Sequence, residues 1–289
     1  MKKLCQLLVL SFLSYVCSAT AAANLQPLLD EIWHYELSIN PIQASQQGIH
    51  DFDDKLADIS PKALAEQDAR FREFIKKLSR INKAALNRSQ QISLLIQQRK
   101  LQNHIDQYSF NAHYMPLTAE SGFHSGLAFL PRSSRFKTIV DYQNYLARLE
   151  QFPTFFEQQI HWMKKGIQTG LVQPKVVLQG FEDSIKSFIH DSPKDSVFYA
   201  PFIHFEGTRF DSIQQQKLRE QASLVISNRV FGAYQKYYDF FTTEYFLKSK
   251  ANIAAKSLPN GAAFYQNRSD FYTTTNMSVD EIHSLGLQE

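Results

Sequence analysis

Apolar side chains recur every three or four residues through most of this 289-residue chain, which is the spacing of amphipathic α-helices. In the first run, over residues 25–37, Leu28, Leu29 and Ile32 share a face, and Asn40-Pro41 ends the helix. The pattern predicts an all-α fold. Further helices are expected near residues 41–48, 61–81, 87–108, 138–149, 153–170, 174–192 and 211–246.

Local signals support several of these boundaries. Ser60 before Pro61 is an N-cap with proline in the first turn, and Thr138 with Asp141 resembles a capping box. Gly232 is the expected bend of the long helix that begins near residue 211, because glycine weakens a helix interior. Strand-like sequence is confined to residues 175–178 and 262–272, so any β element is minor.

Two stretches lack a helical period. Residues 112–137 carry glycines and prolines that predict a long structured loop, and residues 197–210 predict a second irregular connection. Long loops inside a compact domain are usually functional.

The first 23 residues have the pattern of a secretory signal peptide. Lys2 and Lys3 precede an apolar run too short to span a bilayer, and Ala21-Ala22-Ala23 offers a cleavage site. We therefore expect residues 24–289 to be released into the periplasm or secreted, with no membrane contact after cleavage. A lipoprotein is the less favoured alternative, because Val16 stands before Cys17 where a small residue is expected.

Composition argues against disulfide bonds in the mature chain and against nucleic-acid binding. Both cysteines, Cys5 and Cys17, lie in the signal peptide, so stability must come from the core. Subtracting Lys2 and Lys3 from 31 basic residues leaves 29 against 28 acidic ones. The mature chain is nearly neutral, and we expect no nucleic-acid partner, because such binding requires a clustered basic surface.

No complete set of catalytic or metal-binding residues is visible. His50 with Asp51, Asp53 and Asp54 is the densest group of potential metal ligands, but a solvated turn is the favoured interpretation. Residues 121–126 resemble a nucleophile elbow with His124 in place of the serine, so we expect a glycine-bearing loop whose exposed His124 lines a cleft. Ser134 and Lys137 match a Ser-x-x-Lys pair without its companion motifs.

Near the C-terminus, Ser278 and Glu281 form a capping box that opens a further helix through Ile282 and Leu285. A helix that begins so close to the last residue predicts that the chain is the N-terminal portion of a larger fold. The alternative is a disordered tail.

Several motifs together resemble the bacterial family named domain of unknown function 885. They cover most of the mature chain and include Asn40-Pro41, Ala44-Ser45, Gly48-Ile49-His50, residues 141–149, residues 166–175, residues 198–202, Leu258-Pro259-Asn260-Gly261, Phe264-Tyr265, residues 272–275 and residues 281–287.

This resemblance implies a helical zinc-peptidase-like protein, in which metal-activated water hydrolyses a peptide with a glutamate as general base. The family's presumed metal motif lies beyond the segment around His283, so no metal ligand or catalytic residue is assigned here. Zinc is expected only in full-length relatives. The resemblance also implies that residues 259–265 and 272–275 form an extended segment beside the cleft, where Gly261 and Tyr265 approach a peptide. The competing interpretation is a turn glycine and a packing aromatic.

Two functions therefore remain open. The first is an N-terminal, catalytically incomplete part of an exported metallopeptidase-like protein, with a separately encoded C-terminal half as a candidate partner. The second is a stand-alone helical binding module without enzymatic activity.

Overall fold

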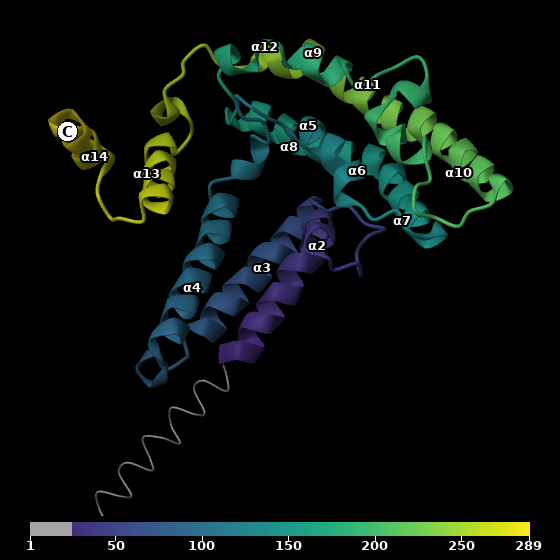
Figure 1. Cartoon of the computed structure of the whole chain (residues 1–289). Coiled ribbons are helices and arrows are strands. Elements are labelled where there is room, and N and C mark those ends of the chain that lie inside the picture. Colours follow the sequence, from purple (N-terminus) through teal and green to yellow (C-terminus); the bar gives the residue numbers. More distant parts are fainter. Residues whose placement is uncertain (1–24) are drawn as a thin grey trace, which may run out of the picture. The chain divides into compact units, whose positions relative to one another are not determined.

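The computed structural model describes residues 25–289, so the predicted signal peptide lies outside the described part of the chain. These residues form helices joined by turns, and their only ladder contacts are the isolated bridges Leu117–Gly122 and Pro174–Lys250. The all-α prediction is confirmed (Figure 1). The chain divides into two compact units, one containing the residues up to Ser38 with Pro61–Ser109, the other Ile39–Ser60 with Phe110–Glu289.

The first unit consists of the helix over residues 25–39 with α3 (Pro61–Leu78) and α4 (Arg88–Ser109). Their apolar faces meet in a small core that includes Phe74, Leu78 and Leu101, each fully buried. Tyr35 contacts the ring of Phe74 edge-on, with centroids 5.6 Å apart. The three helices predicted from the sequence in this region are therefore confirmed.

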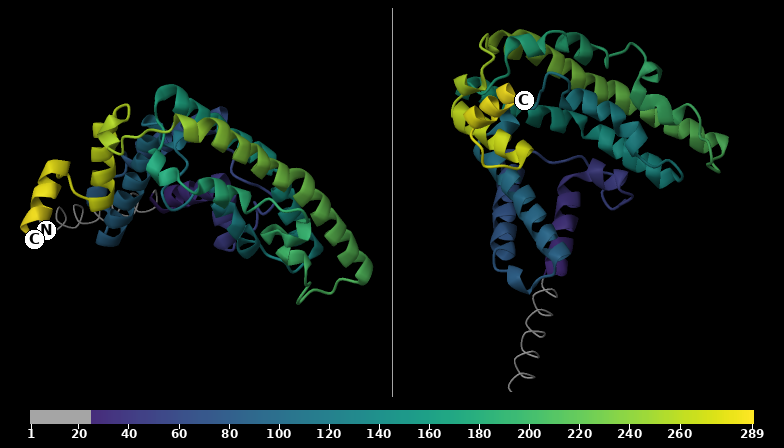
Figure 2. Two further views of the ribbon diagram at one scale, coloured as in Figure 1. Left: turned by 90° about the horizontal axis from the view of Figure 1, so that it is seen from above. Right: turned by 60° about the vertical axis from the view of Figure 1, so that its left-hand side comes forward.

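The second unit is built on two long helical runs (Figure 2). The first run is α7 (Ile139–Glu150) followed by α8 (Phe152–Thr169), and the second contains α10 (Ser212–Val225), α11 (Phe231–Phe240) and α12 (Phe246–Lys248). α7 packs beside α10, and α8 packs beside α11. The other α-helices of this unit are α2 (Pro41–Gln46), α5 (Phe123–Gly126), α6 (Leu130–Ser133), α9 (Phe181–Lys186), α13 (Gly261–Thr273) and α14 (Val279–Gln288).

Aromatic rings fill the core between these two runs. Phe156 of α8 lies 4.8 Å from the ring of Tyr234 in α11, and Phe152 and Phe198 pack edge-on at 5.2 Å. Two of the buried tyrosine hydroxyls find carbonyl acceptors, since Tyr145 donates to Phe198 and Tyr234 donates to His124, whereas the buried hydroxyl of Tyr237 has no partner among the described residues. Because the first two hydroxyls are hydrogen-bonded, they can lie inside an apolar core.

The second helical run departs from α-helical geometry on either side of the expected bend, not at it. Residues Ile226–Val230 and Phe241–Tyr245 each form a π-helical turn, while Gly232 lies within α11. A π-turn inserts one residue into the helical repeat and so changes which side chains face inward. Tyr234, Tyr237, Phe241 and Tyr245 are all buried as a result of this register.

Both strand predictions are wrong. Lys175–Leu178 forms a 3₁₀ turn, and residues 262–272 lie within α13. The aromatic residues at 262–272 suggested a strand, but the preference of aromatic residues for β-strands depends on their surroundings in the fold. At this position Asn260 adopts a left-handed conformation (φ 53°), and Gly261 comes so close to the Ala255 carbonyl that a Cβ would lie 2.0 Å from it. The resulting tight turn feeds the chain directly into a helix.

The two irregular stretches contain more structure than their sequences suggested. Residues 112–137 include α5, α6 and two 3₁₀ turns, and Val197–Phe202 forms a buried 3₁₀ segment. The continuous helix expected from Pro174 is absent from the described chain there: a 3₁₀ turn and the short α9 take its place.

Candidate functional site

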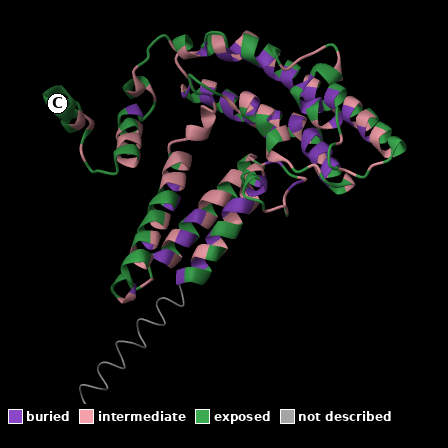
Figure 3. Ribbon diagram, viewed as in Figure 1, coloured by how far each residue is buried: buried purple, intermediate pink, exposed green. Residues whose placement is uncertain are grey.

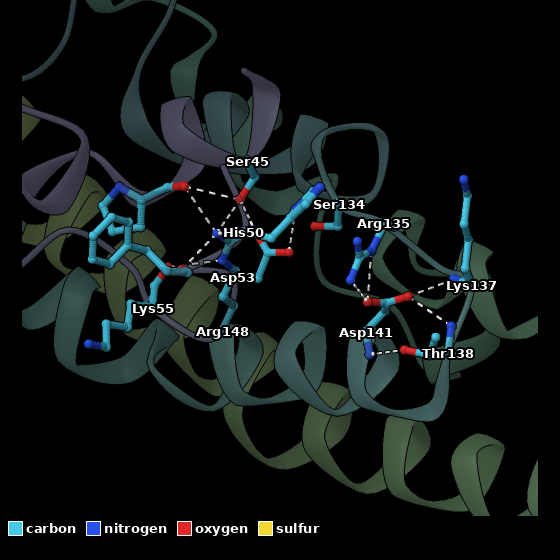
Figure 4. A network of polar contacts seen from close by, with 12 residues as sticks. Ser45, His50, Asp53, Lys55, Ser134, Arg135, Lys137, Thr138, Asp141 and Arg148 are labelled. Carbon is cyan, nitrogen blue, oxygen red and sulfur yellow. Dashed lines mark hydrogen bonds and ion pairs between the residues drawn. The ribbon is translucent and has the colours of Figure 1, made fainter. Parts of the chain in front are cut away.

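Arg148 is the most unusual side chain of the second unit, because its guanidinium is fully buried. It projects from α7 towards residues 41–55, as Figure 4 shows. Nη2 donates to the carbonyls of Pro41 (3.1 Å) and Phe52 (3.0 Å), and Nε donates to the carbonyl of Lys55 (2.9 Å). We call Arg148 with Ser45, His50 and Asp53 the Arg148 cluster.

Acidic and polar groups of that segment balance the buried charge. Asp53 is buried and lies 3.7 Å from Arg148 Nη2, while it accepts hydrogen bonds from Ser45 Oγ and from His50 Nδ1 at 2.8 Å. Ser45 Oγ in turn accepts a bond from Arg148 Nη2 at 2.6 Å. Burial lowers the pKa of Arg148, and the nearby Asp53 and Asp54 carboxylates oppose that shift.

The Arg148 cluster lacks the geometry of a catalytic triad. In a triad the serine hydroxyl bonds to the imidazole, whereas here Ser45 Oγ bonds to a carboxylate and a guanidinium. The solvated turn expected for residues 50–54 also needs correction, because the carboxylate of Asp53 is taken into the core. The arrangement can hold residues 41–55 against α7, and that is the role its bonds support.

The start of α7 carries a second buried carboxylate. Asp141 Oδ2 accepts bonds from the backbone N–H groups of Lys137 and Thr138, both at 2.8 Å, and Oδ1 pairs with Arg135. Burial alone would raise the pKa of Asp141, but these hydrogen bonds hold it below its ordinary value. The predicted capping box at Thr138 is confirmed, with Asp141 also binding Arg135.

Two glutamine side chains at the start of α8 and within it bind the backbone of residues 54–59. Gln151 accepts from Leu56 N–H and donates to the Asp54 carbonyl, and Gln158 accepts from Ile59 N–H. Two shallow hollows of about 300 and 240 Å³ flank this segment, both bordered by Leu56, Ala57 and Phe155.

His124 is not the exposed loop residue that the sequence suggested. Its side chain is buried at 1% exposure between aromatic rings, and burial lowers its pKa to about 4. Nε2 lies 3.1 Å from Ser184 Oγ, while Nδ1 is buried without a partner. The surrounding residues form the short helix α5, and Gly122 before it packs so closely that a Cβ there would lie 2.6 Å from the Leu117 side chain. A cleft-lining role for His124 is therefore wrong.

Gly261 and Tyr265 lie in the first turns of α13. Gly261 is buried by the close approach of Ala255, and Tyr265 is 54% exposed. None of the described ring contacts or hydrogen bonds of His124 involves either residue, so the structure does not bring the three predicted contact residues together.

Sequence reasoning missed Arg148 as a functional candidate. One signal could have found it: the two stretches Asn40–His50 and Asp141–Leu149 both carry the family resemblance, and the structure joins them through this side chain. Among residues 25–289, no group of three or more histidine, cysteine, aspartate or glutamate side chains could hold a metal ion. No helix of that described part is both long and apolar enough to cross a bilayer.

Comparison with solved structures gives a similar fold. "The crystal structure of the putative lipoprotein from Colwellia psychrerythraea" superposes with a TM-score of 0.69 at 17% identity. The match covers 95% of this chain and 48% of that chain, so this chain spans about half the length of the Colwellia protein. At this identity the likeness concerns the fold alone.

A search of curated proteins found no match. The family model described as "Bacterial protein of unknown function (DUF885)" matches residues 41–289, which include the Arg148 cluster, both helical runs and the two C-terminal helices. The chain therefore belongs to the DUF885 family.

Proposed function

We propose that this chain is the helical N-terminal portion of an exported zinc-peptidase-like protein and that it does not hydrolyse peptides unaided. One observation carries the proposal: nearly the whole chain aligns with only half of a larger protein of the same fold. In this proposal the chain supplies part of a larger fold, and peptide hydrolysis depends on the polypeptide that completes that fold.

The described residues do not fit a catalytic zinc ion. Such an ion needs about three protein ligands with one open position, and no such group occurs in residues 25–289. The closest candidates, His50 and Asp53, are hydrogen-bonded to each other, and Asp53 also accepts from Ser45. We therefore assign no zinc ligand to this chain and derive no catalytic step through the metal.

Export is part of the same proposal. The sequence of residues 1–23 supports it, and the structurally similar Colwellia protein is described as a "putative lipoprotein", which names a class of exported protein. Release after cleavage at Ala23 is the favoured form, and lipid attachment at Cys17 is the alternative form.

A stand-alone binding module is the second candidate function. It is favoured by α13 and α14, which display apolar and aromatic side chains to solvent. In that case the chain would act by binding alone, without a zinc-bearing partner.

The deciding experiment measures zinc content and peptide hydrolysis. Residues 24–289 are purified alone and also together with the part of a full-length DUF885 protein that lies outside the matched region. Both samples are assayed on a library of quenched fluorescent peptides, with and without a chelator.

We expect the chain alone to contain well under one zinc per molecule and to give hydrolysis no faster than the blank. The combined sample should show chelator-sensitive hydrolysis. Chelator-sensitive cleavage by residues 24–289 alone would overturn the proposal, whereas binding without any activity in the combined sample would favour the binding module.

A further inference from the structure

The two C-terminal helices contain almost no buried side chains. Gly261 is the only buried residue of α13, and no residue of α14 is buried, as the colouring of Figure 3 shows. The rest of the second unit, in contrast, buries at least one large side chain in each of its longer helices.

These helices are nonetheless well formed. Ser278 and Glu281 make a reciprocal capping box at the start of α14. Gln266 joins the pair, because its side chain donates to the Met277 carbonyl (2.8 Å) and accepts from the Val279 N–H (3.0 Å). The helix pair is thus ordered locally by capping and by one bridging side chain.

Length argues that this order needs tertiary support. α13 has 13 residues and α14 has 10, and isolated helices shorter than about 12–15 residues are marginal in water. In most proteins the missing stability comes from packing of an apolar face.

Each helix has such a face. Tyr265 and Tyr272 are seven residues apart and therefore lie on one side of α13, with exposures of 54% and 77%. Val279, Ile282 and Leu285 form a stripe along α14 at helical spacing. Tyrosines are typical of the centres of protein interfaces.

A neighbouring side of α13 anchors the helix to its unit. Phe264 contacts Phe110 of the same unit at 5.5 Å, and Arg268 lies over the rings of both Phe264 and Phe271. Phe264 lies about a quarter turn round the helix from the two exposed tyrosines, which leaves the tyrosine rings outside this anchoring contact.

We propose that Tyr265 and Tyr272 of α13, with the Val279–Leu285 stripe of α14, form a docking surface for the remaining half of a DUF885 fold. This polypeptide is the favoured occupant because the Colwellia protein contains about as much chain again beyond the region that this chain matches. The inference rests on the proposed function, and it names the surface through which the fold is completed.

The test uses residues 24–289 and, as the probe, the part of the Colwellia protein outside the matched region, expressed as a separate polypeptide. Affinity is measured by isothermal titration for the parent and for Tyr265→Ser/Tyr272→Ser. The matched control is Ile213→Ser, which removes an equally exposed apolar side chain (78%) from α10. Circular dichroism establishes that each variant keeps its helix content.

We expect the double tyrosine variant to bind the probe at least tenfold more weakly than the parent, in line with the loss of interface anchor residues. The Ile213 variant should bind within about twofold of the parent, as rim or remote positions do. Absence of binding by the parent, or equal binding by the tyrosine variant, would overturn the proposal. Self-association of the parent that disappears in the tyrosine variant would also overturn it, since a second copy would then occupy the surface.

The outcome is separable from that of the zinc assay. Tyrosine-dependent binding without chelator-sensitive hydrolysis would refute the proposed activity and leave the docking surface intact. Hydrolysis that is unaffected by the tyrosine substitutions would do the reverse.

Discussion

Arg148 shows how one side chain can organise a segment that has no regular pairing of its own. Its guanidinium satisfies three carbonyls of residues 41–55, and backbone carbonyls buried without partners are costly. Burying the charge is tolerable because Asp53 lies beside it and because Nε and Nη2 are hydrogen-bonded, while the buried Nη1 has no partner among the described residues.

Replacing Arg148 by methionine should destabilise the chain strongly. The substitution keeps much of the apolar stem but leaves Asp53 and the carbonyls without their donor, which costs roughly 3 kcal/mol or more of unfolding free energy. Urea denaturation followed by circular dichroism measures the change.

Arg229→Met is the matched control, because Arg229 forms an exposed ion pair with Glu150 at 2.8 Å. Exposed pairs contribute about 1 kcal/mol or less, so this variant should unfold near the parent midpoint. If the two variants lose the same stability, the assigned role of Arg148 is wrong.

His124 makes the stability of the protein depend on pH. Burial lowers its pKa from 6.5 to about 4 in the folded chain, so between these values the unfolded state binds more protons. Stability is then full above about pH 6.5 and declines as the pH falls towards 4, by about 3 kcal/mol for a shift of this size.

Melting curves between pH 7.5 and pH 4.5 test this expectation. His124→Phe should flatten the decline, although it also removes the contact with Ser184 and can lower stability at every pH. A parent and variant with parallel pH profiles would show that His124 does not titrate in the way described. Burial also lowers the pKa of His113 to about 4 and lowers that of His104, so these two residues contribute to the decline that persists in the variant.

Among the elements, α8 and α11 provide a pair of helix glycines with opposite surroundings. A Cβ at Gly166 would lie 2.5 Å from the Leu171 carbonyl and 3.0 Å from that of Tyr114, whereas a Cβ at Gly232 would have no neighbour within 4 Å. Gly166→Ala should therefore destabilise by about 1–3 kcal/mol. Gly232→Ala should stabilise by about 0.5–1 kcal/mol, because alanine is the better helix former.

Thermal unfolding of the two alanine variants, each compared with the parent, gives the sign directly. Equal shifts would mean that helix propensity alone governs both positions and that the close approach at Gly166 relaxes without cost.

Element boundaries were predictable wherever a local signal fixed them. Pro61 begins α3, Thr138 caps α7 and Ser278 caps α14, all as the sequence indicated. α13 was mistaken for a strand because the decisive features are the left-handed Asn260 and the close contact at Gly261, which depend on neighbours brought together by folding. The π-turns around α11 leave no local sequence signal either.

For the molecule as a whole, the candidate site was less predictable than the fold. A lone arginine on an amphipathic helix usually lies in water, and only the folded chain reveals that Arg148 meets residues 41–55. The same error occurred at His124, where a glycine-bearing loop suggested exposure and the structure shows burial. Both errors concern contacts between distant positions, which periodicity and capping cannot report.

The Arg148 cluster also constrains the order in which the chain can fold. Arg148 lies 107 residues after Pro41 and 93 after Lys55, so residues 41–55 lack this tether until synthesis has delivered α7. Contacts of such long range form slowly, since closing the loop costs entropy before any bond is gained. During this interval the early segment is exposed to proteases and depends on chaperones for protection.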